Sequence, residues 1–251
     1  MKQITLFVYI IGICLGLGVN ANALTLTEVD AVWQAVEGAT ISEQSNYEGH
    51  GSNRTKTSVT DKIQWGTWQS QSGLGFTTAV GSRDISLDSA FSIGSLSHYN
   101  NPIPADSVLP SATLDLTISF WDSDISNSVF DLTFSLTFDI DETPNTGTSE
   151  ENADHISWTF TDTVETTVVG LDGITYTYAL EILGFKTASE STYSDSLTSY
   201  ENATTATTLW AQITRTSSST ETNPVPEPAT MALVSFGLMG LAGVARRKKN
   251  K

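Results

Sequence analysis

Hydrophobic and polar residues alternate most clearly in the middle of the chain, over residues 129–140 (VFDLTFSLTFDI). Every second position from Phe130 to Ile140 is large and apolar, and each position between them is polar. Residues 112–121 (ATLDLTISFW) repeat the pattern, and the polar, turn-rich sequence DSDISNS connects the two segments. A period of two is typical of a β-strand with one buried face, so these segments predict an antiparallel hairpin.

Further strands are predicted where the alternation recurs. Residues 174–185 (ITYTYALEILGF) alternate, Asp172-Gly173 before them favours a tight turn, and residues 163–169 are their predicted hairpin partner. The remaining predicted strands, of which the last two have a weaker pattern, lie at residues 155–160, 207–214, 31–36 and 62–65.

Polar residues fill two long predicted loops, at 141–154 and 187–204. Several short strands with polar turns and no helical period predict an all-β fold, an antiparallel two-sheet β-sandwich that is jelly-roll-like. Each sheet is expected to bury one face and expose the other.

Both ends of the chain differ from this pattern. At the start, Lys2 precedes an apolar run, and Ala21-Asn22-Ala23 fits a small-x-small cleavage site, so residues 1–23 are predicted to be a signal peptide. This prediction implies export by the Sec machinery and removal by signal peptidase. The single cysteine, Cys14, lies in this segment, which leaves the mature chain without a thiol or a disulfide.

The predicted body, residues 24–216, is strongly acidic. Between residues 24 and 225 there are 6 basic and 27 acidic residues, a net charge of −21. Such a charge repels nucleic acid and anionic lipid surfaces, so no nucleic-acid partner is predicted. It can attract divalent cations or simply keep an exported protein soluble. A polar linker is predicted at residues 217–224.

The C-terminal segment is apolar and then basic. Residues 231–245 carry no charge, and as a helix these 15 residues would span about 22 Å. The hydrocarbon core of a bilayer is about 30 Å thick, so residues 230–245 predict one short transmembrane helix. The basic tail, residues 246–251, would stay in the cytoplasm and leave the body outside. Its charged residues directly after the helix are Arg246, Arg247, Lys248 and Lys249.

The order of these features resembles a known sorting signal. Val225-Pro226-Glu227-Pro228, an apolar segment and a basic tail together resemble the PEP-CTERM signal of Gram-negative bacteria, over residues 225–251. The resemblance implies an exosortase, a membrane transpeptidase, as partner, with cleavage near the Pro-Glu-Pro sequence. It also implies bacteria that make extracellular polysaccharide. The protein is then expected at the inner membrane with its body in the periplasm, and afterwards at the cell surface or in the extracellular matrix.

A second resemblance lies in the body. The sequence SHYN, with Ser97, His98 and Asn100, is followed by NPI and resembles the THxN motif of a PEP-CTERM protein family, which is related to choice-of-anchor domains. Residues 63–76 and 138–145 resemble two further stretches of that family. The family often has a histidine where Asp141 stands and a cysteine pair in the next loop, and this chain has neither.

Two hypotheses account for the SHYN sequence. In the first, its polar side chains bond the backbone at a tight corner that Asn101-Pro102 turns. In the second, His98 joins the acidic loop that follows in a metal site. An oxygen-rich set of that kind suits calcium, although the spacing of an EF-hand loop is absent. The predicted ligands are Asp139, Asp141, Glu142, Asn145 and Asp154, with His155 as a further candidate.

Catalytic motifs are not found. The imidazole bases available are His50, His98 and His155, and the sequence contains no G-x-S-x-G, H-E-x-x-H or P-loop pattern. The chain is therefore predicted not to be an enzyme. No cofactor is predicted beyond a candidate calcium ion.

The tryptophans suggest a different function, the binding of carbohydrate. Trp121, Trp158 and Trp210 lie in or beside predicted strands and are expected in the core, whereas Trp65 and Trp68 are expected to be exposed and to stack on sugar rings. The main prediction is an exported surface or matrix protein with a structural or adhesive body. The alternative is a carbohydrate-binding module, with or without calcium, that acts on extracellular polysaccharide.

Overall fold

The computed structural model describes residues 23–218, apart from 49–53, 124, 126–128, 144, 161–162 and 188. Most of the predicted signal peptide and of the predicted linker, together with the predicted transmembrane helix at 230–245 and the basic tail, lie outside the described residues. No helix in the described part of the chain is both long and apolar enough to cross a membrane.

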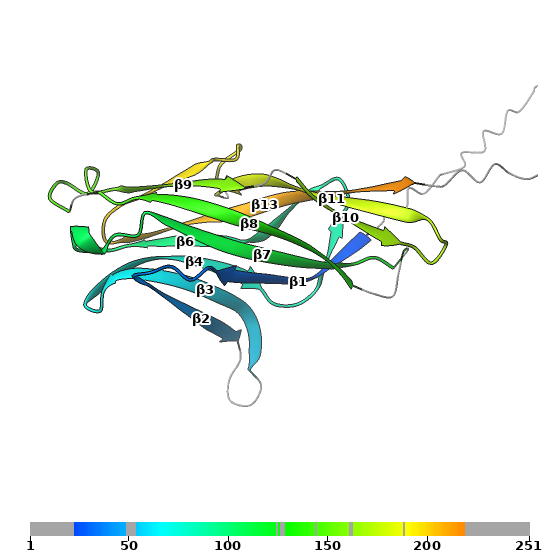
Figure 1. Ribbon diagram of the computed structural model, residues 1–251, viewed down its shortest axis with the longest axis horizontal. Helices are drawn as coiled ribbons and strands as arrows, with labels where there is room; N and C mark the ends of the chain where they lie inside the picture. The colour runs from blue at the N-terminus through cyan, green and yellow to red at the C-terminus, as the bar shows by residue number, and fades with distance from the viewer. Residues whose placement is uncertain are drawn as a thin grey trace, which may run out of the picture.

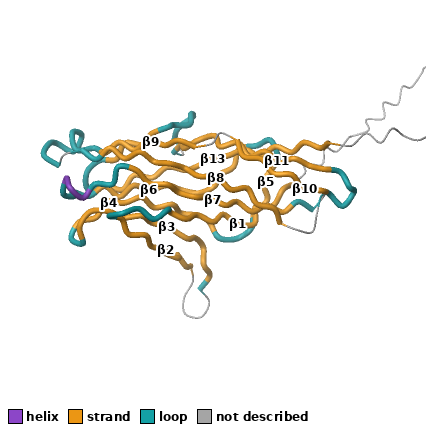
Figure 2. The backbone as a smooth tube through the Cα atoms, viewed as in Figure 1, coloured by secondary structure: helices purple, strands orange, loops and turns teal. Residues whose placement is uncertain are grey.

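The described chain forms an all-β sandwich of two sheets, as predicted (Figure 1 and Figure 2). All neighbouring strands are antiparallel. The first sheet has the order β12 (Ser196–Ser199), β9 (Asp154–Phe160), β8 (Val129–Asp141), β7 (Ser111–Trp121), β1 (Ala23–Trp33) and β5 (Arg83–Ser86). The second has the order β10 (Thr163–Val169), β11 (Thr175–Lys186), β13 (Ala203–Ser218), β6 (Ala90–Asn100), β4 (Ser70–Ala79), β3 (Thr55–Thr67) and β2 (Ala39–Glu48).

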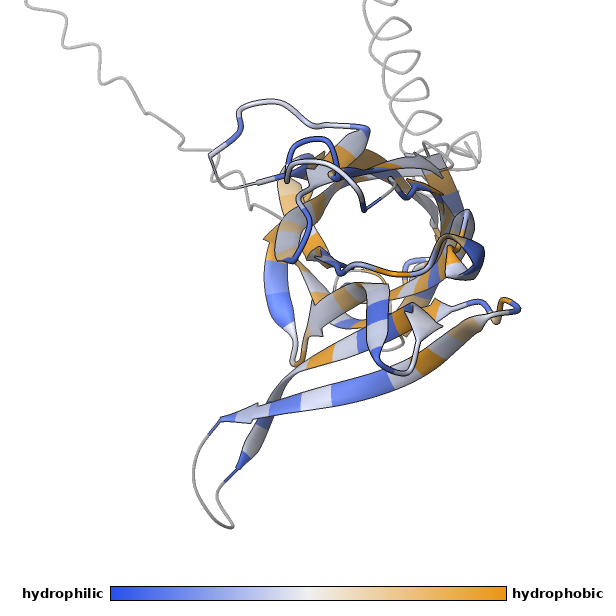
Figure 3. Cartoon of the chain, turned by 90° about the vertical axis from the view of Figure 1, so that its left-hand side faces the viewer, coloured by the Kyte–Doolittle hydropathy of each residue, from blue (hydrophilic) through white to orange (hydrophobic). Residues whose placement is uncertain are grey.

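The two sheets face each other around one apolar core. Figure 3 shows the strands surrounding this interior, with the β2–β3 hairpin extending beyond it. Aromatic rings of β8 and β9 in the first sheet contact Phe185 of β11 in the second: its ring centroid lies 4.5 Å from that of Trp158 and 6.4 Å from that of Phe138. A short 3-10 helix, η2 (Ala105–Ser107), follows β6.

The strongly alternating segments form strands where expected. β7 and β8 pair as the predicted hairpin, with Ser111 opposite Asp139 and Trp121 opposite Val129. β10 pairs with β11 across a turn in which the Asp172 carboxylate accepts the Ile174 amide and Gly173 adopts a φ of 75°. This positive φ explains why the turn uses glycine.

The weaker predictions differ from the structure in their bounds. β1 spans Ala23–Trp33, so the strand predicted at 31–36 overlaps only its last three residues. A bulge between Leu26 and Glu28 interrupts the alternation of β1. Residues 62–65 are part of β3, which has 13 residues. Since a bulge adds one residue on one strand, it shifts the buried positions from even to odd numbers and weakens the sequence pattern.

Three other boundaries change because strand pairing extends further than the pattern showed. β13 continues to Ser218, opposite Thr175, so the first two residues of the predicted linker belong to a strand. Ala23, the last residue of the predicted signal peptide, pairs with Ser86. The predicted loop 187–204 contains β12, which pairs with β9.

The tryptophan predictions were right in part. Trp158 is buried in the core, and Trp210 is only half-buried. Trp121 was expected in the core but is 36% exposed, so that prediction is wrong. The buried row of β7 ends at Phe120, and the next residue of a strand points to the opposite face.

Candidate metal centre

A polar centre lies at one end of the sandwich, where the inward rows of several strands change from apolar to polar side chains. On β8, the buried row of Phe138 and Ile140 continues past the strand to Glu142. On β9, the buried row begins with Asp154 and continues with Ile156. Glu142 follows Asp141, which is opposite His155, so the pairing brings Glu142 and Asp154 side by side.

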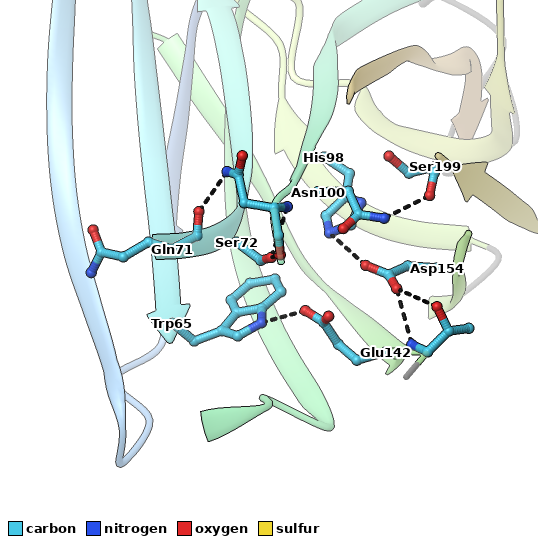
Figure 4. A network of polar contacts seen from close by, with 10 residues as sticks. Trp65, Gln71, Ser72, His98, Asn100, Glu142, Asp154 and Ser199 are labelled. Carbon is cyan, nitrogen blue, oxygen red and sulfur yellow. Dashed lines mark hydrogen bonds and ion pairs between the residues drawn. The ribbon is translucent and has the colours of Figure 1, made fainter. Parts of the chain in front are cut away.

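The other sheet contributes a histidine. The inward row of β6 runs from Leu96 to His98 and Asn100, and all three side chains are buried. His98 therefore faces the two carboxylates across the interior, as Figure 4 shows. Its Nε2 lies 3.9 Å from Oδ2 of Asp154. One ligand atom from each of His98, Glu142 and Asp154 lies within 4.8 Å of the other two.

Neighbouring groups hold these side chains in place. The Trp65 indole donates its N–H to Oε1 of Glu142 at 2.6 Å, and its ring stacks on His98 with centroids 6.1 Å apart and planes 18° apart. The Thr143 amide donates to Oδ1 of Asp154 at 3.0 Å. Each carboxylate thus has one oxygen fixed by a donor, and Oδ2 of Asp154 faces His98 instead.

Several buried polar atoms at the centre have no hydrogen-bond partner among the described residues. Neither ring nitrogen of His98 is paired, although its side chain is 0% exposed, and Oδ2 of Asp154 is also unpaired at 1% exposure. Buried polar groups are normally paired, and each unpaired group costs about 1–3 kcal/mol. Other buried atoms without a partner are Oδ1 of Asn100, two residues after His98, Oγ of Ser199, which is opposite Asp154 in the sheet, and both carboxylate oxygens of Glu201.

Burial also determines the charge states. It lowers the pKa of His98 to about 4, so the imidazole is neutral at neutral pH and has a free lone pair. Burial, followed by the charge of Asp154, raises the pKa of Glu142. The pKa of Asp154 is raised by burial, and that of Glu201 by burial and by Asp154. Three carboxyl groups therefore lie close together in a buried place, where burial and their mutual repulsion make it unfavourable for all of them to be ionised at once.

The predicted ligand set is divided between two faces of the sheet. Glu142 and Asp154 point inward, but Asp139 and Asp141 are exposed on the outer face of β8. His155 is also on the outer face, where its Nδ1 lies 3.2 Å from the Thr198 hydroxyl. The prediction of one oxygen-rich site is therefore wrong, because alternate residues of a strand point to opposite faces.

Asn145 is close to the centre but does not face it as a ligand. Its amide donates to the Ile103 carbonyl at 3.2 Å, and the residue is exposed. Asn145 and Glu142 both line a pocket of about 360 Å³ beside Ile103 and Val108. Glu142 can therefore be reached from the surface, unlike His98.

The residues of the SHYN sequence alternate between the two faces of β6. Ser97 is on the outer row of β6, away from the centre. The Asn100 side-chain amide donates to the Ser199 carbonyl at 2.8 Å, a backbone bond of the kind that the corner hypothesis expects, but residues 97–100 lie within β6 and not at a corner. Just after the strand, the Asn101 side-chain amide donates to the Gln71 carbonyl at 2.7 Å. His98 makes no such backbone bond in the described part of the chain.

The two candidate sugar-stacking tryptophans have opposite environments. Trp68 is 87% exposed in the turn between β3 and β4. Trp65 is only 1% exposed, so its predicted exposure is wrong. It continues the inward row of Ile63 and packs beneath His98 and Glu142. Its part in the polar centre was missed, because that contact lies across two sheets.

The comparisons with known proteins concern the C-terminal end. Residues 224–249 match the PEP-CTERM protein-sorting motif. This motif implies an exosortase as the processing partner and an exported, surface-directed protein. The match covers the predicted sorting signal and does not extend to the β-sandwich body. No curated protein matches the chain significantly.

Proposed function

We propose that this chain is a structural or adhesive protein of the cell surface or extracellular matrix, delivered by its PEP-CTERM segment. The observation that carries the proposal is the sorting-motif match at residues 224–249, which follows a compact β-sandwich body. Its source would be a Gram-negative bacterium that makes extracellular polysaccharide. The protein is not proposed to be an enzyme.

The proposed route follows the order of the segments. Signal peptidase removes residues 1–23 after Sec export, and the helix at 230–245 holds the body on the periplasmic side of the inner membrane. Arg246 and Arg247 begin the cytoplasmic basic tail. Exosortase then cuts near Pro226 or Pro228, and the body reaches the surface or the matrix.

The outer face of the first sheet supports an adhesive role. Hydroxyl and carboxylate side chains form cross-strand pairs between β7 and β8, which leave a polar, hydrogen-bonding surface. These pairs are Thr117 with Thr133 at 3.2 Å, Ser119 with Asp131 at 2.7 Å and Ser135 with Asp115 at 2.6 Å. Such a surface can bond polysaccharide hydroxyls without a deep pocket.

Deletion of the exosortase in the source bacterium tests the route. We expect the full-length protein to accumulate in the membrane fraction, with its body accessible to protease added to the periplasm. A Glu227→Ala, Pro228→Ala double variant should accumulate in the same way. Thr222→Ala, a linker substitution outside the motif, should be processed normally. Unchanged size and location in the deletion strain would refute the proposal.

A carbohydrate-binding module is the second candidate, and the exposure of Trp68 favours it. A tryptophan that is 87% exposed on a hairpin turn has a free ring face, and aromatic faces suit the apolar faces of sugars. Trp68→Ala is expected to abolish pull-down of the processed protein by matrix polysaccharide. Trp121→Ala, at a second partly exposed tryptophan, is the control and should retain binding. If the unaltered protein binds no matrix polysaccharide, this candidate is excluded.

A further inference from the structure

We propose that His98, Glu142 and Asp154 form a binding site for one divalent transition-metal ion of the zinc class. The proposal concerns the body of the protein and does not depend on the sorting route. It also differs from the calcium site that the acidic sequence suggested.

Geometry is the first support for this proposal. One ligand atom from each of the three residues lies within 4.8 Å of the other two, and the closest approach from His98 to Asp154 is 3.9 Å. Zinc binds nitrogen and oxygen ligands at about 2.0–2.2 Å, which places two tetrahedral ligands about 3.3 Å apart. Small side-chain movements of about 1 Å would therefore close the three groups around an ion.

The unpaired buried nitrogens of His98 are an independent observation. The side chain is 0% exposed and faces Asp154, yet neither ring nitrogen has a hydrogen-bond partner in the described structure. A proton shared between Glu142 and Asp154 would relieve the carboxyl groups but would leave the imidazole unpaired. A bound cation satisfies all three groups together.

The surrounding contacts resemble the outer shell of a metal site. Metal-ligating carboxylates are usually hydrogen-bonded through their other oxygen. Here Trp65 donates to one oxygen of Glu142, and the Thr143 amide donates to one oxygen of Asp154. These donors orient the two carboxyl groups, which also hydrogen-bond each other, so an ion at the site would replace the proton between them.

The donor set determines the class of metal. Calcium takes six to eight oxygen ligands, and the structure separates Asp139 and Asp141 from this centre. Imidazole suits zinc, copper, iron and nickel. Glu201 is the candidate fourth ligand, because both its carboxylate oxygens are buried and unpaired and its charge acts on Glu142. Water is the other candidate for this position.

The site would join the two sheets. His98 belongs to β6 of the second sheet, whereas Glu142 and Asp154 follow and begin strands β8 and β9 of the first. Binding to the folded state alone raises stability. A metal here would therefore cross-link the sandwich, whose residues 24–216 contain no cysteine.

Zinc binding by the purified full-length protein tests the proposal. After removal of metals with a chelator, we expect one Zn²⁺ per chain by calorimetry and a higher melting temperature with Zn²⁺ than without it. His98→Ala should weaken Zn²⁺ binding at least about 100-fold. His155→Ala, at an exposed histidine near the same end, should bind as the unaltered protein does. Trp65→Phe should weaken binding about 10–100-fold, as expected for an outer-shell donor.

Cobalt provides a second readout that does not depend on stability. Co²⁺ bound by His98 and two carboxylates should give a visible absorption spectrum that Glu142→Gln and Asp154→Asn each remove. Circular dichroism of each variant shows whether it has folded. The proposal is overturned if the unaltered protein binds no Zn²⁺, if His155→Ala loses binding as His98→Ala does, or if Ca²⁺ binds at the centre and Zn²⁺ does not.

Discussion

At the scale of single residues, buried titratable side chains gather in two separate places in the sandwich. One is the centre around His98, and the other is Asp122, which accepts a hydrogen bond from Tyr178 at 2.8 Å and contacts Arg215 at 2.6 Å. Asp122 is 4% exposed and Arg215 is 13% exposed. Both sets bridge strands of different sheets, so each couples the two layers.

Asp122→Ala is expected to lower the free energy of unfolding by about 3 kcal/mol. Removal of one partner leaves the Arg215 charge and the buried Tyr178 hydroxyl without that carboxylate, and a broken buried pair typically costs about 3–5 kcal/mol. Chemical denaturation of the body measures the change. Asp131→Ala is the control, since Asp131 is exposed on the outer face of β8. Equal effects of the two substitutions would show that the buried pair contributes little.

Asp61 should make stability fall with rising pH. Burial, together with Glu43 and Asp30, raises the pKa of Asp61 from 3.8 to about 6. The folded state therefore holds this proton more tightly than the unfolded state, and the contribution to stability is lost as pH rises from about 4 to about 7.

Asp61→Asn removes this titration and tests the sign of its effect. The variant should be more stable than the unaltered protein at pH 8, by no more than about 1 kcal/mol because the group is partly exposed, and equal to it near pH 4. Melting temperatures across this pH range measure the difference. Glu48→Gln, on the same hairpin, is the control. A stability difference that is constant with pH would contradict the assignment.

Part of the candidate site could be predicted at this scale. Sequence reasoning proposed His98, Glu142 and Asp154 within a larger set, and the strand alternation already separates Asp139 and Asp141 from Glu142. The roles of Trp65 and Glu201 could not be found in that way. They depend on which strands of opposite sheets face each other, and no local pattern carries that information.

At the scale of elements, long alternation was sufficient to predict a strand and bulges were the main obstacle. β7, β8 and β11 follow the pattern over most of their lengths, and their predicted hairpins formed. β1 was underestimated because its bulge moves the buried row from Leu26 to Val29. β12 has only four residues, which is too short for periodicity to identify.

Close packing of β6 against β4 makes Gly94→Ala an informative substitution. A methyl group at Gly94 would lie 2.5 Å from the Phe76 ring and 2.8 Å from the Thr77 carbonyl oxygen. Overpacking of this kind typically costs about 1–3 kcal/mol, so the melting temperature should fall. Ser97→Ala, on the outer row of the same strand, should change it little. An unchanged melting temperature for Gly94→Ala would mean that Phe76 moves freely.

At the scale of the whole molecule, the polar centre and Ser218, the last described residue, lie at opposite ends of β13. His98 pairs with Thr205 near the start of β13, and the strand continues to Ser218, about 40 Å further at about 3.3 Å per residue (Figure 1). The sorting motif begins at residue 224, shortly after this strand.

The termini of the mature protein test the central claim most directly. Mass spectrometry of the protein collected from the cell surface or medium should give an N-terminus at Leu24 and a C-terminus between Val225 and Pro228. The same protein from an exosortase-deficient strain should still contain the basic tail. A surface protein that retains Lys251 in the presence of exosortase would contradict the account.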